Sequence, residues 1–127
     1  MMFKYTCLLL IIFLTSCSDF TYEKNIYKNY YLIGVDTKDN ISISIKLKSG
    51  DFSARIQWVK QYAIANDTFL FAKAINNINI NDYYILNMSK DSEYAKIEDV
   101  VIGPLDSLSF ANNWGMRYKV KFISVTE

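Results

Sequence analysis

Histidine is absent from this chain of 127 residues. Its absence removes the commonest general base of enzymes and the nucleophile pairs that combine serine or cysteine with histidine. It also removes the commonest nitrogen ligand of zinc. The routes to catalysis that remain open are a pair of carboxylates or a Ser-Lys pair.

Cysteine, proline and glycine are scarce, and neither sign of charge is in excess. The chain has two cysteines, one proline and four glycines, too few of the latter two for low-complexity linkers. The chain has fourteen basic and thirteen acidic side chains, and without Lys4 the two numbers are equal. A balanced charge favours neither nucleic acid nor a cationic partner. We therefore expect no nucleic-acid binding.

Apolar side chains are plentiful. They make up 51% of the chain, and aromatic residues alone make up 16%. This content is typical of a folded domain and lies well outside the disordered range. The length suits one small domain that buries about two-thirds of its unfolded surface.

The N-terminus carries a short apolar run that ends close to a cysteine. Lys4 is followed by about ten largely apolar residues up to Leu14, the size of a secretory signal. A membrane-spanning helix needs roughly 20 apolar residues. The run is closed by Leu14-Thr15-Ser16-Cys17. The alternative to a signal is a buried N-terminal helix in which Cys17 is an ordinary thiol.

Leu14-Thr15-Ser16-Cys17 resembles the lipobox of bacterial lipoproteins, with an aliphatic residue, two small residues and a cysteine. The resemblance implies cleavage before Cys17, a diacylglyceryl group on its sulfur, often a further acyl chain such as palmitate on its amine, and a lipid anchor in a membrane of the bacterial cell envelope. Two or more chains hold stably, since each buried methylene contributes about 0.8 kcal/mol. Cys7 would leave with the signal, so the mature protein would have neither a disulfide nor a free thiol.

The expected organisation follows from this resemblance and from the composition. Residues 1–16 are predicted to be the signal peptide, 17–29 a lipidated tether and 30–127 a single globular domain. The tether is inferred because residues 18–29 are mostly polar with scattered aromatic side chains. The sequence leaves open the membrane leaflet, the oligomeric state and whether residues 18–29 are ordered.

Short alternating segments separated by turn residues predict a β-rich domain. The clearest is Ile41–Lys48, in which apolar and polar residues alternate strictly. Arg55–Ile64 is expected to form one strand, with a β-bulge near Val59 and Lys60 where its alternation slips by one residue. Further strands are expected at Tyr30–Val35, Thr68–Ile75, Tyr83–Met88 and Arg117–Val125, with turns at Ser49-Gly50-Asp51 and Asn66-Asp67.

One helix is predicted, in the C-terminal half. Gly103-Pro104 is expected to break the chain, and Asp106 can cap a helix that begins next to it. Leu105 and Phe110 occupy the positions of a hydrophobic staple. The helix is expected from about Ser107 to Asn113. The predicted fold class is therefore α+β and β-dominated, an antiparallel meander sheet with this one short helix.

The acidic residues offer little chemistry. Glu98-Asp99, Asp91 and Glu93 are the densest acids, and a catalytic pair would have to face each other across a cleft. Solvated surface charge is the ordinary explanation. Asp36–Asn40 could offer oxygen ligands to calcium, but it lacks the spacing of an EF-hand loop, and a hairpin turn explains it better. We therefore predict no catalytic residue, no metal site and no cofactor.

Tyrosine and tryptophan are the richer signal. Both residue types bury a large area while keeping a polar group, and so they are favoured at interfaces. Core packing and strand propensity are the alternative explanation for each of them. The candidate partner-binding residues are Trp58, Tyr62, Tyr83 and Trp114.

The order of segments between Arg55 and Phe110 forms a second pattern. The pattern begins with a strand that contains Ile56 and Ala63, followed by an Asn-Asp turn. It continues with Phe69–Lys73, Tyr83-Tyr84-Ile85-Leu86 and Gly103-Pro104-Leu105, and it ends at Phe110. This order resembles an uncharacterised family of short bacterial lipoproteins, a domain of unknown function. The resemblance implies no activity and no ligand.

The expected function is a membrane-tethered, non-catalytic binding module of the cell envelope, whose partner is an envelope protein or a glycan. One alternative is an immunity or inhibitor lipoprotein directed against an envelope-acting enzyme. A second is a carboxylate-dependent cell-wall hydrolase. The hydrolase would require two of the four acids at positions 91, 93, 98 and 99 to converge in a cleft.

Overall fold

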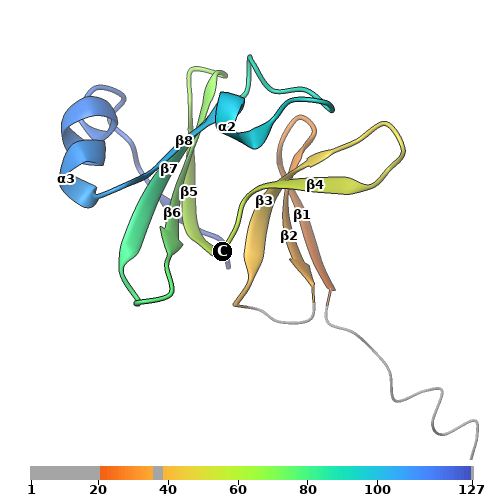
Figure 1. The fold of residues 1–127 in the computed structure, drawn as a ribbon, viewed down its shortest axis with the longest axis horizontal. Helices are drawn as coiled ribbons and strands as arrows, with labels where there is room; N and C mark the ends of the chain where they lie inside the picture. The colour runs from red at the N-terminus through yellow and green to blue at the C-terminus, as the bar shows by residue number, and fades with distance from the viewer. Residues whose placement is uncertain (1–20, 36–38, 127) are drawn as a thin grey trace, which may run out of the picture.

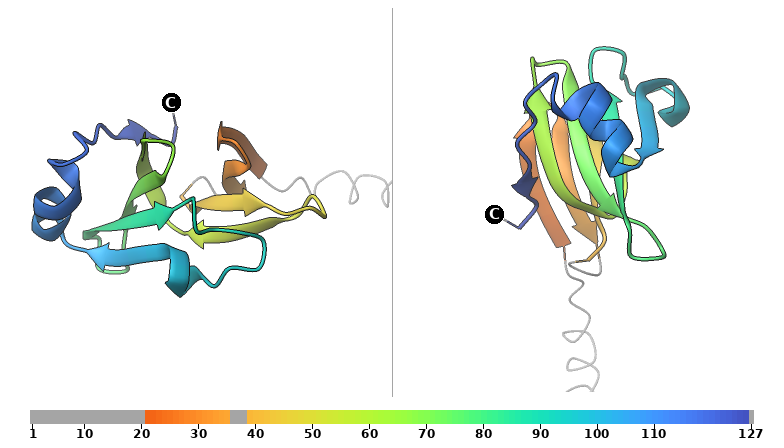
Figure 2. Two further views of the ribbon diagram at one scale, coloured as in Figure 1. Left: turned by 90° about the horizontal axis from the view of Figure 1, so that it is seen from above. Right: turned by 90° about the vertical axis from the view of Figure 1, so that its left-hand side faces the viewer.

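The computed structural model describes residues 21–35 and 39–126, which form two antiparallel β-sheets and a few short helical segments (Figures 1 and 2). The strand order is β1-β2-β3-β4 in the first sheet and β8-β7-β6-β5-β9 in the second. The predicted β-dominated class with a short helix in the C-terminal half is confirmed, although the strands divide between two sheets. The predicted signal peptide and lipobox lie outside the described residues.

The first sheet is a meander whose apolar side chains face the second sheet. In β3 the isoleucines Ile41, Ile43 and Ile45 are buried, as their strict alternation predicted. Each hairpin joins consecutive strands, so all pairings in this sheet are local. Its strands are β1 (Thr21–Tyr27), β2 (Tyr30–Val35), β3 (Ile41–Lys46) and β4 (Phe52–Ile56).

Strand β1 lies in a segment that was expected to be tether. Its side chains alternate in the manner of a half-buried strand, because Tyr22 and Ile26 pack against the core while Thr21 and Glu23 are exposed. It pairs with β2 from Thr21 to Tyr27. Residues 21–27, which the sequence assigned to the tether while leaving its order open, therefore belong to the first sheet.

The segment Arg55–Ile64, expected to be one strand, belongs to two. Strand β4 ends at Ile56 in the first sheet and β5 (Val59–Ala65) begins in the second. Between them Trp58 adopts a left-handed backbone conformation with φ of 59°, which redirects the chain. The expected irregularity is present, as the register of β5 against β6 shifts between Val59 and Gln61.

The second sheet continues as a meander from β5. Asn66 and Asp67 both have positive φ, as a tight hairpin turn of the type I′ class requires, and so this predicted turn is confirmed. The remaining strands are β6 (Phe69–Ile75), β7 (Asn81–Asn87), β8 (Val101–Leu105) and β9 (Ile123–Ser124), and α2 (Ile97–Val100) directly precedes β8.

Two expectations about the C-terminal third are corrected. Gly103-Pro104 lies inside β8, at the edge of the sheet, where a proline without an N–H group is tolerated. Arg117–Val125 was expected to be a strand, yet only β9 pairs, with Gln61 and Tyr62 of β5. The alternation is nevertheless reflected in the packing, because Tyr118, Val120 and Phe122 all pack in the apolar cluster around Phe71.

The predicted helix is present in two parts. It comprises α3 (Ser107–Phe110) and the π-helical turn η1 (Ala111–Gly115). The predicted cap is confirmed, since the Asp106 side chain accepts a 2.7 Å hydrogen bond from the Ser109 backbone N–H. That hydrogen bond holds the pKa of Asp106 below its ordinary value.

Apolar side chains form two clusters, one on each face of the second sheet. Along β6, Leu70 and Ala72 face the first sheet, and Phe71 faces α3. We call the cluster between the sheets the inter-sheet core. The aromatic cluster on the other face contains buried Ala63, Phe71, Ile85 and Phe110, with Phe69, Tyr83, Leu105, Trp114, Tyr118, Val120 and Phe122 packed around them.

Candidate binding site

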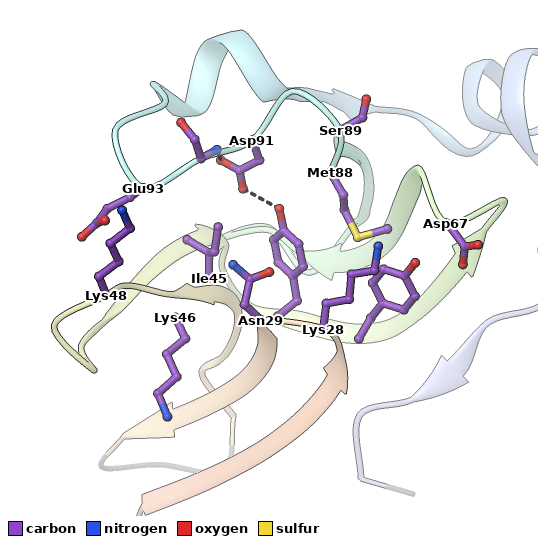
Figure 3. Close-up of a pocket in the computed structure, with 13 residues that line it drawn as sticks. Lys28, Asn29, Ile45, Lys46, Lys48, Asp67, Met88, Ser89, Asp91 and Glu93 are labelled. Carbon is purple, nitrogen blue, oxygen red and sulfur yellow. Dashed lines mark hydrogen bonds between the residues drawn. The ribbon is translucent and has the colours of Figure 1, made fainter.

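A pocket of about 360 Å³ opens at the end of the molecule where several turns meet (Figure 3). Its walls come from the β1–β2 turn, the end of β3, the β5–β6 turn and the loop between β7 and α2. We call it the lysine-rimmed pocket. It is lined by Tyr27, Lys28, Asn29, Tyr30, Ile45, Lys46, Lys48, Asp67, Met88, Ser89, Asp91, Ser92 and Glu93.

A buried ion pair lies beneath the pocket. Nε of Arg55 is 3.1 Å from Oδ1 and 3.0 Å from Oδ2 of Asp91, and the two side chains are 2% and 0% exposed. The other guanidinium nitrogens donate to Ser53 Oγ at 2.8 Å and to the Ser92 carbonyl at 3.0 Å. Arg55 lies on β4 and Asp91 on the β7–α2 loop. The pair therefore fixes that loop against the first sheet.

Tyr30 completes this buried network. Its hydroxyl donates a 2.9 Å hydrogen bond to Oδ2 of Asp91, as Figure 3 shows. Burial raises the pKa of Tyr30 far above its ordinary value of 10.0, and the hydrogen bond to Asp91 and its negative charge add to the rise. The phenol therefore stays a neutral donor throughout the physiological range. Asp91 therefore receives hydrogen bonds from two strands of the first sheet, from Tyr30 on β2 and from Arg55 on β4.

Replacing Tyr30 with phenylalanine is expected to lower the free energy of unfolding by about 1.5 kcal/mol, the value of a hydrogen bond to a charged group. Because the folded-state pKa is raised, this contribution is complete below pH 10 and is lost as the pH rises through the folded-state pKa. Urea unfolding of both proteins at pH 7 measures the difference. Tyr94→Phe is the control, because Tyr94 is 90% exposed. An equal loss in both variants would contradict the role given to the Tyr30 hydroxyl.

Lysine side chains form the rim. Lys28, in the β1–β2 turn, and Lys48, in the β3–β4 turn, are exposed and line the pocket together with Asp67 and Glu93. Lys46, the last residue of β3, extends away from the pocket in Figure 3, and its Nζ lies 5.6 Å from the ring centre of Tyr31. Since Arg55 neutralises Asp91, the two rim lysines balance the two remaining carboxylates that line the pocket. The rim therefore offers two ammonium groups and two carboxylates above a buried floor.

Glu93 contributes an unusual atom to this pocket. Its Oε2 is buried, and among the described residues it has no hydrogen-bond partner in the protein. Leaving a buried acceptor unsatisfied costs about 1–3 kcal/mol, so native proteins rarely do it without a compensating group. A bound hydrogen-bond donor would recover that cost.

The four aromatic residues proposed from the sequence do not form one surface, and none of them lines the lysine-rimmed pocket. Tyr62 is 7% exposed and belongs to the inter-sheet core, the alternative that the sequence also allowed. Tyr83 and Trp114 both pack in the aromatic cluster, Tyr83 stacked on Phe110 with ring centroids 4.8 Å apart. Trp58 is 47% exposed at the β4–β5 junction. Only Trp58 presents close to half of its surface to a partner.

The four acidic residues are also dispersed. Asp91 is buried in its ion pair and Glu93 lines the pocket, while Glu98 and Asp99 are exposed on α2. Within residues 21–35 and 39–126, no three acidic, cysteine or histidine side chains gather as a metal site would need. In the same ranges, no helix has the length and apolar character required to cross a membrane. Asp36 of the suggested calcium ligands lies outside the described residues.

Sequence reasoning missed the residues that build the pocket. The sequence places Tyr30 and Arg55 in predicted strands, and its pattern does not indicate that Lys28 and Lys48 share one pocket. A charged residue inside an apolar strand segment, as Arg55 is beside Ile56, is the one local signal that pointed to a buried partner.

Comparisons of the chain with protein-family models, curated proteins and solved structures find no match. The resemblance of Arg55–Phe110 to a lipoprotein family and that of Leu14–Cys17 to a lipobox therefore stay predictions from the sequence. The fold and the pocket rest on this chain's own residues.

Proposed function

We propose that this chain is a lipid-anchored, non-catalytic binding module that holds an acidic segment of an envelope protein in the lysine-rimmed pocket. Leu14-Thr15-Ser16-Cys17 supports the anchor through its resemblance to a lipobox. The pocket supports the binding role. Its floor is a closed network in which Asp91 is already engaged, which favours recognition over catalysis.

The observation that carries the proposal is the buried, unpaired Oε2 of Glu93 next to a lysine rim. A hydrogen-bond donor would satisfy Glu93, and an anion would pair with the ammonium groups of Lys28 and Lys48. A polypeptide segment supplies both, through its backbone N–H groups and its Asp or Glu side chains. An acidic peptide segment is therefore the ligand that suits this pocket best.

The position of the pocket supports an outward-facing role. Tyr27 lines the pocket at one end of β1, and Thr21 begins the same strand at the other end. A strand of this length spans about 20 Å at 3.3 Å per residue. The pocket therefore opens at the end opposite the one that the lipid anchor would hold.

Site-specific photo-cross-linking in intact cells tests the binding role. A cross-linking amino acid replaces Ser89, which is exposed and lines the pocket, and in a second strain it replaces Asn112, which is exposed on η1. A protein adduct is expected from position 89 and not from position 112. Lys28→Glu with Lys48→Glu is expected to reduce the adduct roughly tenfold through charge repulsion. Equal adducts from both positions would contradict the proposal.

Labelling with an alkyne fatty acid tests the anchor. The wild-type chain is expected to carry the label and to sediment with membranes, whereas Cys17→Ala is expected to do neither. A labelled Cys17→Ala protein would contradict acylation at this residue.

A further inference from the structure

The end of the domain at which β1 begins presents exposed apolar side chains. Val35 is 54% exposed, Trp58 47%, Ile78 73% and Ile80 55%. They come from the end of β2, the β4–β5 junction and the β6–β7 loop. We call this surface the Thr21 end.

Several contacts bring these segments to the same end. Thr21 is the register partner of Val35, and the Ile75 N–H, just before the β6–β7 loop, donates to the Trp58 carbonyl at 3.1 Å. One hollow is lined by Asp39, Trp58 and residues of that loop. Figures 1 and 2 show the β6–β7 loop at the end of the molecule where β1 begins. The exposed apolar side chains therefore share one end.

Covalent geometry limits how far this end can lie from Cys17. Four residue steps join Cys17 to Thr21, and an extended chain spans at most about 3.6 Å per residue. Thr21 therefore lies within about 14 Å of Cys17. An acyl chain on Cys17 would place the Thr21 end against the headgroup region of the membrane.

We propose that the Thr21 end rests on the bilayer that holds the anchor, with Val35, Trp58, Ile78 and Ile80 in its interfacial layer. The inference rests on the proposed acylation of Cys17. Tryptophan is favoured at this depth because its ring is apolar and its indole N–H can bond to headgroups. The hollow beside Trp58 is lined by uncharged asparagines and by one acidic and one basic residue, Asp39 and Lys60. Its charges balance, so the contact is expected to rest on the apolar side chains and not on attraction to charged lipid.

Such a contact fixes orientation as well as depth. A short tether alone lets a domain tilt freely, whereas apolar contacts from three separate segments hold it upright. The lysine-rimmed pocket, at the far end of β1, is then directed away from the membrane.

Fluorescence of one tryptophan at a time tests the contact. The lipidated mature protein is reconstituted into phosphatidylcholine–phosphatidylglycerol vesicles, with or without lipids brominated near the headgroup. In a Trp114→Phe variant only Trp58 emits, and its emission is expected to shift to shorter wavelength and to lose most of its intensity on brominated lipid. In the matched Trp58→Phe variant only Trp114 emits, and it is expected to be unaffected.

The outcomes separate the inference from the anchor. Mass spectrometry of the reconstituted protein reports the acyl chain on Cys17, and a missing chain would overturn the proposed anchoring. An acylated, vesicle-bound protein whose Trp58 is not quenched would overturn the membrane contact alone. So would a Trp58 shielded from both brominated lipid and soluble acrylamide, which indicates cover by a second copy. Ile78→Asn with Ile80→Asn is expected to weaken the quenching without lowering the melting temperature.

Discussion

Replacing Asp91 with alanine is expected to lower the free energy of unfolding by about 3–5 kcal/mol, the usual effect of removing one partner from a buried ion pair. The loss is large because Arg55, 2% exposed, would keep its charge without a counter-ion, and Tyr30 would lose its acceptor. Urea denaturation monitored by circular dichroism measures the change.

Two matched variants show whether the cost comes from the unpaired charge. Asp99→Ala removes an exposed acid and is expected to change stability by no more than about 0.5 kcal/mol. Arg55→Met combined with Asp91→Leu removes both charges and is expected to recover much of the loss, since apolar replacements of buried pairs are often neutral. A double variant as unstable as Asp91→Ala would show that the pair itself, and not charge burial, decides the stability of this region.

Replacing Phe71 with alanine is expected to cost about 3–5 kcal/mol, as removal of a buried aromatic ring from a core does. Phe71 is fully buried at the centre of the aromatic cluster. Its ring packs against those of Phe110, Trp114 and Tyr118, with centroids 5.7, 6.1 and 5.8 Å away. The cavity would lie between the second sheet and α3. Loss of near-ultraviolet circular dichroism is expected to accompany the lower stability.

The control for Phe71 is an aromatic residue outside both clusters. Tyr94, at 90% exposure, is expected to tolerate alanine with a change of no more than about 0.5 kcal/mol. Phe71→Leu, which keeps most of the volume, is expected to fall between the two. A small effect of Phe71→Ala would mean that α3 and η1 close over the cavity, and that this cluster contributes less than its burial indicates.

Local patterns predicted the strands whose neighbours are close in sequence. Ile41–Lys46 could be read from strict alternation, and the Asn66-Asp67 turn from residues that accept positive φ. The Asp106 cap was predicted for the same reason, because its hydrogen bond reaches only three residues along the chain. In each case the physical cause lies within one turn or one strand.

The predictions that were wrong concern segments whose structure depends on contacts with distant parts of the fold. Exposed and half-buried side chains alternate along Thr21–Tyr27, but most of these residues are polar, so their hydrophobic pattern is weak. The strand forms because it pairs with β2. Gly103-Pro104 interrupts a helix yet is harmless on an edge strand. The division between β4 and β5 arises at Trp58 because two sheets pack against each other, which no window of sequence reports.

The pocket could not be predicted from the sequence either, because its residues are distant from one another along the chain. Arg55 and Asp91 are 36 residues apart, and Tyr30 and Asp91 are 61 apart. Nothing local links these residues, and only the folding of the β7–α2 loop over the first sheet joins them. The sequence indicates aromatic binding candidates only by residue type. Whether such a residue is buried, as Tyr62 is, or exposed, as Trp58 is, depends on the tertiary structure.

The central position of strand β6 determines how slowly its backbone amides exchange hydrogen with solvent. It pairs along its length with β5 on one side and β7 on the other, and both of its faces are covered by apolar clusters. Its backbone amides can therefore exchange hydrogen with solvent only when the whole domain unfolds. β1, at the edge of the first sheet, can detach while β6 stays intact. Amides of Leu70–Ala74 would thus be the last to take up deuterium.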